Sequence, residues 1–222
     1  MIAMKWHVTP ERWVPMTMMS DKQEMSMVTP ADWVPGPRQG EWTYEMYSAL
    51  PEDGHRYEII QGVLMMSPAP EIAHQAVIMR LSRYLDEQIF STERGWVFLA
   101  PTDVVLSPQK VVQPDILVLL HKHQDRLKKR YIEGAPDLVV EVISPSSAVY
   151  DRLVKHNLYA ESGVPEYWLV NLQDQSIEVF VLEGKHFHSL GLFRNEQQIK
   201  SLLIPNETLQ ASHFFNWGWK RQ

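Results

Sequence analysis

The sequence predicts an α/β protein with a mixed central β-sheet flanked by helices. Short apolar runs of strand length, such as Ile116–Leu120, lie between segments that contain glycine and proline. Between them, residues 74–90 have the apolar spacing of a helix with one buried face. Hydrophobic residues make up 45% of the chain and charged residues 22%, as is typical of a soluble globular protein. Within the 222 residues we expect one domain, which follows an irregular N-terminal extension.

The extension is assigned to residues 1–41, which are rich in Met, Trp and Pro. The motif Val-Thr-Pro-x-x-Trp-Val-Pro occurs at residues 8–15 and again at residues 28–35. Two copies are too few for a solenoid, which needs about three stacked repeats or more. We interpret the segment as an irregular surface wrap, and the alternative is a pair of Trp-bearing motifs that dock a partner.

The elements of the main domain, residues 42–222, can be placed in order. Thr43 is a candidate N-cap for a short helix that ends near Leu50. Residues 56–60 and 63–66 alternate as a hairpin around Gln61-Gly62, and a long helix follows at residues 74–90. Further strands are expected at residues 96–100, 102–106, 112–120 (interrupted at Pro114-Asp115), 137–143, 167–171, 177–182 and 186–190, with helices at residues 125–131, 149–162 and within 206–217.

Composition and motifs exclude several classes of protein. Without cysteine the chain has no disulfide, thiolate–zinc site or cysteine nucleophile. The net charge of −6 gives no bulk attraction for nucleic acid, so any polyanion site must be local. No stretch approaches the roughly 18 apolar residues of a membrane span, and the N-terminus lacks the pattern of a signal peptide. We therefore expect a cytoplasmic protein that does not contact a membrane. The sequence also lacks the glycine frames of a serine hydrolase or an NTPase.

Three carboxylates interrupt apolar strand patterns: Glu58, Asp115 and Glu141. A charge buried alone costs several kcal/mol, so each acid should be paired or bind a metal. A single such acid is usually a structural salt-bridge partner. Three in successive core strands instead favour an oxygen-only cluster, which suits Mg²⁺ or Mn²⁺.

A cation is expected beside these acids. Asp151 and Lys155 are four residues apart and share one face of the helix that follows the Glu141 strand. A lysine near metal-bound acids can orient a water or stabilise charge on a phosphate. The alternative is an ordinary surface pair worth about 0.3–0.5 kcal/mol.

Several linked segments resemble the Uma-two family, which belongs to the PD-(D/E)xK restriction-endonuclease-like superfamily. The resemblance covers residues 42–217. It rests on Tyr57-Glu58-Ile59-Ile60-Gln61-Gly62, Pro70-Glu71 to His74-Gln75, Val112-Gln113-Pro114-Asp115, Ala135 to Ser146, Asp151 to Lys155, and Gly163 to Val170.

The resemblance implies a metal-dependent endonuclease that hydrolyses DNA phosphodiester bonds. Asp115 matches the PD element, and Glu141 matches the first acid of (D/E)xK. Ile143 stands where the superfamily has its lysine, so the resemblance makes Lys155 in the following helix the substitute. It further implies that Asp115 and Glu141 hold Mg²⁺ (or Mn²⁺) with the Val142 carbonyl. Glu58 would be an additional acid of the site.

Other residues are candidates for the cleft or for DNA contact. His74 is expected to line the cleft, and a capping or surface role is the alternative. One dense basic run occurs in the chain, at Arg126, Lys128, Lys129 and Arg130. It forms either a solvated helix face or a patch that binds phosphates. The terminal segment 217–221 offers stacking and charge or simply covers the core. Two His-x-His pairs, at residues 121–123 and 186–188, lack an evident third ligand, so zinc is not expected.

Two other functions remain open. One is a non-catalytic module that keeps the nuclease fold to bind nucleic acid or protein. The other is a metal-dependent hydrolase of a different phosphodiester, which fold analogy cannot separate from a DNA nuclease. Because double-strand cleavage commonly uses two sites, a homodimer is the expected assembly.

Overall fold

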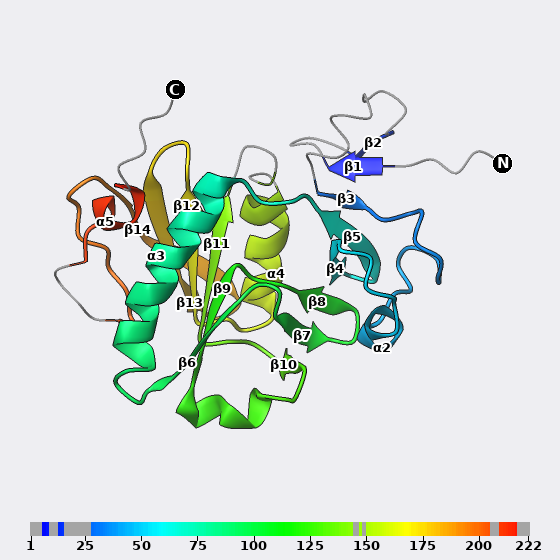
Figure 1. Cartoon of the computed structure of the whole chain (residues 1–222), viewed down its shortest axis with the longest axis horizontal. Coiled ribbons are helices and arrows are strands. Elements are labelled where there is room, and N and C mark those ends of the chain that lie inside the picture. Colours follow the sequence, from blue (N-terminus) through cyan, green and yellow to red (C-terminus); the bar gives the residue numbers. More distant parts are fainter. Residues whose placement is uncertain are drawn as a thin grey trace.

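The structure is a computed structural model that describes residues 6–8, 13–15, 28–143, 147, 150–204 and 209–216. Its main part consists of two six-stranded sheets, each with parallel and antiparallel pairs, and a few helices (Figure 1). Trp6–Val8 (β1) and Trp13–Pro15 (β2) pair separately as an antiparallel hairpin. The mixed α/β class predicted from the sequence is confirmed, although the strands divide into two sheets where one central sheet was expected. No helix in the described part of the chain is long and apolar enough to cross a membrane.

The first sheet is built on the predicted hairpin. Its order is β10-β7-β8-β4-β5-β3. The strands are Thr29–Pro30 (β3), Arg56–Ile60 (β4), Val63–Ser67 (β5), Asp103–Ser107 (β7), Lys110–Val112 (β8) and Tyr131–Glu133 (β10). Gln61 and Gly62 both have positive φ, as a tight hairpin turn requires. A Cβ on Gly62 would lie 2.2 Å from the Gly40 oxygen, so only glycine fits there.

The first sheet begins before Trp42, the residue at which the domain was predicted to start. β3 pairs with β5, and Ala31 is fully buried in the same core as Trp42. After Thr43, a short helix spans Tyr44–Ser48 (α2), close to the predicted range. Thr43 occupies the N-cap position, but its side chain makes no capping hydrogen bond. The first copy of the repeat, residues 8–15, lies largely outside the described residues.

The second sheet forms the centre of the molecule. Its order is β14-β13-β12-β11-β9-β6. The strands are Gly95–Leu99 (β6), Ile116–Leu120 (β9), Leu138–Ile143 (β11), Glu166–Asn171 (β12), Ser176–Glu183 (β13) and His186–Arg194 (β14). β11 and β12 are parallel, so the chain between them must cross over, and it does so through a helix. Alternate residues of β9, β11 and β12 enter the two cores on either side of the sheet.

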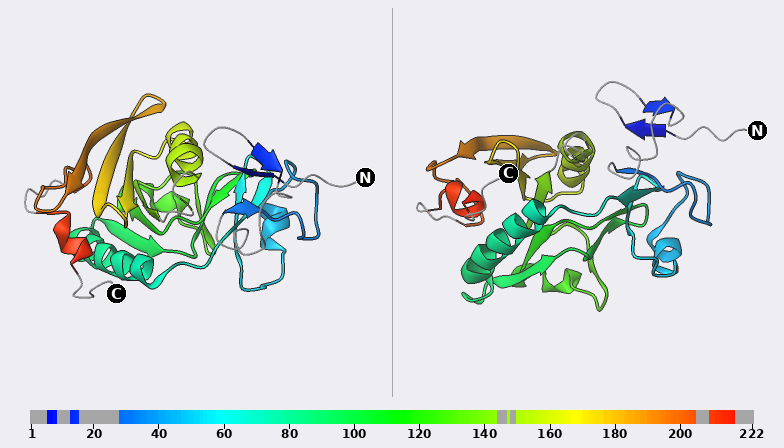
Figure 2. Two further views of the ribbon diagram at one scale, coloured as in Figure 1. Left: turned by 90° about the horizontal axis from the view of Figure 1, so that it is seen from above. Right: turned by 45° about the horizontal axis from the view of Figure 1, so that its top comes forward.

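Helices cover both faces of the second sheet (Figure 2). Ile72–Ile89 (α3) packs one apolar stripe, which includes Val77, Leu81 and Leu85, into the first core. The crossover helix packs on the other face, and it consists of a π-helical turn, Tyr150–Lys155 (η3), followed by His156–Glu161 (α4). Ser212–Phe215 (α5) lies beside α3 and is the terminal helix expected within residues 206–217.

The helix predicted at residues 125–131 was wrong. His121–Arg126 form a 3-10 helix (η2), and Tyr131 begins β10. Leu127 makes a β-bridge with Ile132, so the charged residues between them form a turn. Their composition suits a helix, but pairing of the flanking residues overrides this local preference. The expected turn at residues 144–147 lies outside the described residues except for Ser147, and residues 217–221 lie outside them entirely.

Candidate active site

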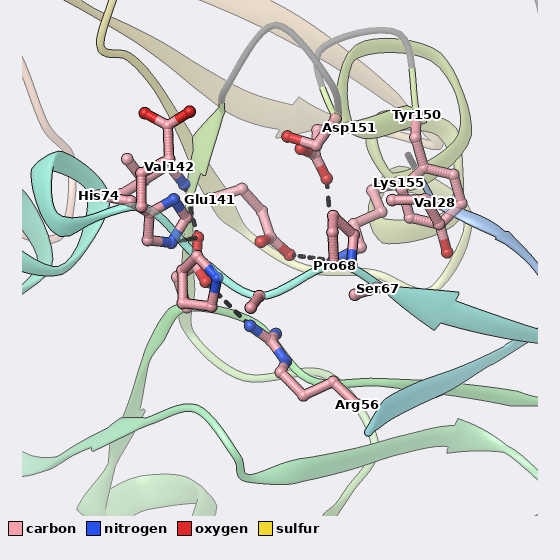
Figure 3. Close-up of a pocket in the computed structure, with 15 residues that line it drawn as sticks. Val28, Arg56, Ser67, Pro68, His74, Glu141, Val142, Tyr150, Asp151 and Lys155 are labelled. Carbon is pink, nitrogen blue, oxygen red and sulfur yellow. Dashed lines mark hydrogen bonds and ion pairs between the residues drawn. The ribbon is translucent and has the colours of Figure 1, made fainter. Parts of the chain in front are cut away.

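A pocket of about 270 Å³ lies where α3, β11 and η3 approach one another (Figure 3). The segment between β5 and α3, from Ser67 to Glu71, forms one wall. Six charged or titratable side chains among the lining residues bear on the chemistry: Arg56, His74, Asp115, Glu141, Asp151 and Lys155. Five of these six were singled out from the sequence, and their roles stay predictions.

Strand pairing brings Asp115 and Glu141 together. β9 runs antiparallel to β11, with Ile116 opposite Val140. Asp115 directly precedes Ile116, so it reaches the level of Glu141 on the neighbouring strand. Asp115 Oδ2 accepts a 2.9 Å hydrogen bond from the Val142 backbone N–H. Gln113 and Pro114 separate β8 from β9, so Asp115 lies directly before β9, and it lines the pocket.

Lys155 is buried among three carboxylates. Its Nζ lies 2.9 Å from Glu58 Oε1, 3.0 Å from Glu141 Oε1 and 3.8 Å from Asp151 Oδ1. Only 4% of Lys155 and 4% of Asp151 is exposed, so this is not the surface pair considered as the alternative. The π-helical turn of η3 places both residues on the pocket side of the helix.

Glu58 lies behind the pocket and not in its lining. It is fully buried, and its Oε1 accepts a 2.8 Å hydrogen bond from the Gln113 N–H in addition to the Lys155 contact. Its Oε2 accepts a 3.3 Å bond from the Tyr150 hydroxyl. Glu58 therefore fixes the ammonium of Lys155 and the segment that leads to Asp115.

The carboxylates differ in how readily they ionise. Burial, followed by the nearby Asp115, Asp151 and Glu58, raises the pKa of Glu141 to about 8 although Lys155 opposes the shift. Burial likewise raises the pKa of Asp151 to about 6. Burial acts on Asp115 too, but His74, Arg56 and the Val142 N–H outweigh it and lower the pKa. The pKa values of Glu141 and Asp151 are thus raised, whereas that of the neighbouring Asp115 is lowered.

Arg56 is a pocket residue that the sequence reasoning missed. Its Nη2 donates to the Gln113 backbone oxygen (2.5 Å) and its Nε to Gln113 Oε1 (3.3 Å). Its Nη1 lies 3.5 Å from Asp115 Oδ1. Arg56 and Glu58 are two apart on β4, and such residues share one face of a strand. That spacing was a signal that could have identified it.

Two tyrosines were also missed, because their hydroxyl groups reach acids that are distant in sequence. Tyr159 donates a 2.6 Å hydrogen bond to Glu141 Oε1, and Tyr150 donates to Glu58. Both are buried aromatic residues of the crossover helix, Tyr150 in η3 and Tyr159 in α4, so their spacing indicates only core packing. Nothing in the sequence pattern distinguishes them from other core aromatics.

His74 lies in the first turn of α3, and 9% of the residue is exposed. Its Nε2 is 3.1 Å from Asp115 Oδ2. The expectation that His74 lines the cleft agrees with its place in the pocket wall. The segment Pro68 to Pro70, which precedes α3, also lines the pocket, and Figure 3 labels Pro68 there.

The basic run does not reach the pocket lining. Arg126 donates a hydrogen bond to the Ala135 oxygen, and Lys128 pairs with Glu133 at 3.0 Å. These contacts lie toward the beginning of β11, whereas Glu141 lies toward its end. Lys129 and Arg130 are exposed in the turn before β10. Any contact of this run with DNA would therefore be made outside the pocket.

The described residues contain no cluster of side chains that is already arranged to bind a metal ion. No three His, Asp or Glu side chains there converge as they would around an ion, either at the His-x-His pairs or in the pocket. In the first pair, His123 Nδ1 instead lies 3.0 Å from Asp137 Oδ1, and His121 packs against Trp96. In the pocket, Glu141 is engaged by Lys155 and Tyr159.

Comparison with known proteins identifies one family and one fold. Residues 44–212 match the profile of Uma2, described as "Putative restriction endonuclease". A solved structure described as a "putative nuclease belonging to DUF820" from Anabaena variabilis matches with a TM-score of 0.67. The match covers 79% of this chain and 98% of that one at 19% sequence identity, which shows a shared fold. No curated protein matches the sequence.

Proposed function

Since the chain belongs to the Uma2 family, described as "Putative restriction endonuclease", we propose that it is a metal-dependent endonuclease acting on DNA. The observation that carries this proposal is the pocket that combines Asp115 and Glu141 from neighbouring strands with the buried ammonium of Lys155. Acids and a lysine in this arrangement can bind a divalent cation and a phosphate at the same place.

The charge of the site fits a divalent cation. When all four carboxylates, on Glu58, Asp115, Glu141 and Asp151, are ionised, their formal charge is −4. Lys155 and Arg56 contribute +2, which leaves −2 in a largely buried cluster. The raised pKa values of Glu141 and Asp151 reflect this surplus as well as burial. Carboxylate oxygens suit Mg²⁺ and Mn²⁺. Asp115 and Glu141 would hold the ion, with the Val142 carbonyl as the third donor proposed from the sequence.

The bound ion would polarise the scissile phosphate and lower the pKa of an attacking water. Lys155 would contribute positive charge and hydrogen-bond donors. Burial alone would lower the pKa of Lys155, but Glu141, Glu58 and Asp151 outweigh it and raise the pKa. The ammonium therefore keeps its proton at neutral pH, so Lys155 orients water and stabilises the charge of the transition state but does not act as a general base.

Arg56 would provide a second cation for the phosphate. Two of its three nitrogens are held by Gln113, while Nη1 faces Asp115 at 3.5 Å, a distance too long for a strong hydrogen bond. A guanidinium fixed on one side and weakly engaged on the other can donate to a phosphate oxygen with little loss of entropy. Asp151 would tune the charge near Lys155.

The test is cleavage of supercoiled plasmid by the wild type and by Asp115→Ala, Glu141→Ala and Lys155→Ala, each with Mg²⁺, with Mn²⁺ and with chelator. We expect metal-dependent cleavage by the wild type and its loss in the three variants. Asp137→Asn is a matched control, because Asp137 is a buried acid at the opposite end of the same strand, outside the pocket. Near-wild-type cleavage by Glu141→Ala would overturn the proposal, provided that circular dichroism shows all variants folded.

The same preparation tests the proposed homodimer. Each chain offers one such pocket among its described residues, so cutting both strands requires two chains or two successive nicks. Light scattering should give twice the mass of 25.9 kDa, and linear product should appear together with nicked product. A monomer that only nicks would refute the dimer and leave the active site unaffected.

A further inference from the structure

Gln113, two residues before Asp115, is buried outside the lining of the pocket. Its side-chain Nε2 donates a 2.9 Å hydrogen bond to Asp103 Oδ1 and a 3.0 Å bond to the Tyr47 hydroxyl. Its Oε1 accepts a 3.3 Å bond from Arg56 Nε, and its backbone oxygen accepts a 2.5 Å bond from Arg56 Nη2. Asp103 and Tyr47 do not line the pocket either, so Gln113 connects two residues outside the pocket to an arginine inside it.

These partners allow the Gln113 amide only one orientation. A carboxylate accepts hydrogen bonds and a guanidinium only donates them, so Nε2 must face Asp103 and Oε1 must face Arg56. The Tyr47 hydroxyl donates to Asp103 at 3.1 Å, but a hydroxyl can bond to either end of an amide. Asp103 is therefore the residue that fixes the direction of the Gln113 side chain.

The contacts with Gln113 in turn fix the guanidinium of Arg56. Nε and Nη2 form one edge of this planar group, and both are bonded to oxygens of the same residue. Nη1 is left facing Asp115 at 3.5 Å, and Figure 3 shows the guanidinium directed into the pocket. Asp115, Glu58 and Glu141 all attract this cation. Without its neutral anchor, the guanidinium would turn onto one of these acids and away from an incoming phosphate.

We propose that Gln113 is the positioning residue for Arg56, and that Asp103, although outside the pocket, thereby influences how the site holds a DNA phosphate. The proposal rests on the nuclease function proposed above. Gln113 does not itself contact the phosphate and acts only through Arg56. Loss of its amide should therefore impair phosphate binding and cleavage only as far as Arg56 contributes to them.

The position of Arg56 can be measured in the full-length protein without DNA or metal. In a ¹⁵N-labelled sample, an arginine Nε–H that is held in a hydrogen bond exchanges slowly with water and gives a resolved NMR signal. Arg56→Gln identifies the Arg56 signal by its disappearance. The reference is Arg83, whose side chain is 82% exposed. We expect the Arg56 Nε–H to exchange at least about tenfold more slowly than that of Arg83, because it is held in a hydrogen bond with a charged donor.

Two variants should remove this protection. Gln113→Met should abolish it, because Met matches the length of Gln but offers Arg56 Nε no strong acceptor. Asp103→Leu should weaken it, because the Tyr47 hydroxyl alone lets the amide turn around, and Nε2 cannot accept a bond from Arg56.

Gln39→Met is the matched control. The Gln39 Oε1 accepts a 2.8 Å bond from the Leu64 N–H, so this variant also removes an amide contact of the first sheet. It does so near the hairpin turn, whereas Arg56 lies at the far end of β4. The Arg56 signal should therefore stay protected in Gln39→Met.

Single-turnover cleavage tests whether Gln113 acts through Arg56. Gln113→Met alone should lower the rate by about tenfold or more, as a displaced phosphate ligand does. Added to Arg56→Gln, the same substitution should lower the rate no further. If the two effects multiply instead, Gln113 acts through another group, such as Glu58, which accepts a bond from its backbone N–H, and the inference is overturned.

The outcomes separate this inference from the function on which it rests. If the Arg56 Nε–H of the wild type exchanges as fast as that of Arg83, Gln113 does not hold the guanidinium, and the inference fails while the nuclease proposal stands. This wild-type measurement decides the question even if the variants do not fold. If the Arg56 signal is protected but the wild type cleaves no DNA with any metal ion, the nuclease proposal fails and Gln113 still positions Arg56.

Discussion

Replacing Lys155 by Met should destabilise the metal-free protein strongly. Met has a similar length and fills the space of the lysine chain but leaves Glu58, Glu141 and Asp151 without their shared cation. Removing one partner of a buried ion pair costs about 3–5 kcal/mol, because the remaining charge is stranded away from water. For a chain of this size, each kcal/mol lowers the melting temperature by about 2–4 °C, so a decrease of about 6–20 °C is expected.

The loss should depend on pH in a defined direction. Without Lys155, the three buried acids can avoid a negative charge only by staying protonated in the folded protein. In the unfolded chain the same acids ionise at a lower pH. The stability from such protons is present at low pH and is lost as the pH rises through the folded-state pKa. Already in the wild type these pKa values are about 6 for Asp151 and about 8 for Glu141. The difference between Lys155→Met and wild type should therefore be larger at pH 8 than at pH 5.5.

Urea denaturation followed by circular dichroism at both pH values measures this effect. Lys110→Met is the matched control, because Lys110 pairs at 3.1 Å with Glu161, whose side chain is 55% exposed. That variant should lose less than about 1 kcal/mol at either pH. If Lys155→Met loses no more than Lys110→Met, the reasoning that the buried cluster depends on this ammonium is refuted. Added Mn²⁺ should restore part of the loss, by about 2.7 kcal/mol at a concentration of 100 times Kd.

Two further predictions concern the same pocket. Burial raises the pKa of Glu141 to about 8 from 4.5, so the proton it keeps stabilises the metal-free fold below pH 4.5, and this contribution disappears as the pH rises through 8. Glu141→Gln should flatten that decline in urea titrations between pH 5 and 8, and an unchanged slope would contradict the shift. Arg56→Gln should reduce the slope of log affinity against log salt for a DNA duplex by about 0.9, measured by fluorescence anisotropy. Arg152→Gln, which removes an ion pair with Glu178 outside the pocket, should leave the slope unchanged.

The features that could be predicted from the sequence are those with local causes. The stripe that buries α3, the hairpin at Gln61-Gly62 and the apolar strands β9 and β11 each follow from periodicity within a few residues. The strand acids were recognised because a charge in such a pattern is costly. Lys155 was found through its spacing from Asp151 and through the family resemblance.

The features that could not be predicted depend on pairing between distant segments. Whether β4 and β9 share one sheet is decided by hydrogen bonds far apart in sequence, and the two strands lie in different sheets. For the same reason, nothing near Glu141 indicated that Tyr159 bonds to it. The charged stretch after η2 was misread as a helix because the bridge between Leu127 and Ile132 is not visible in its composition.

The contrast between Glu141 and Glu166 shows why burial alone does not identify a site. Both are strand acids with no more than 3% of the residue exposed. Glu166 accepts four hydrogen bonds, from the Trp168 indole, the Ser201 hydroxyl and the backbone N–H groups of Leu202 and Leu203. These neutral donors are distributed over both oxygens and hold the carboxylate without a cation, so Glu166 is suited to fixing the loop that it contacts.

Glu141 has the opposite surroundings. Its hydrogen bonds from Lys155 and Tyr159 both fall on Oε1, and Glu58, Asp115 and Asp151 crowd it with like charge. With one ammonium shared among these acids, Glu141 is stabilised further by a proton or by a second cation, and the pocket beside it gives a cation access. The balance of donors and like charges around each acid is visible only in the fold. It distinguishes Glu166, whose oxygens neutral donors satisfy, from Glu141, which like charges surround.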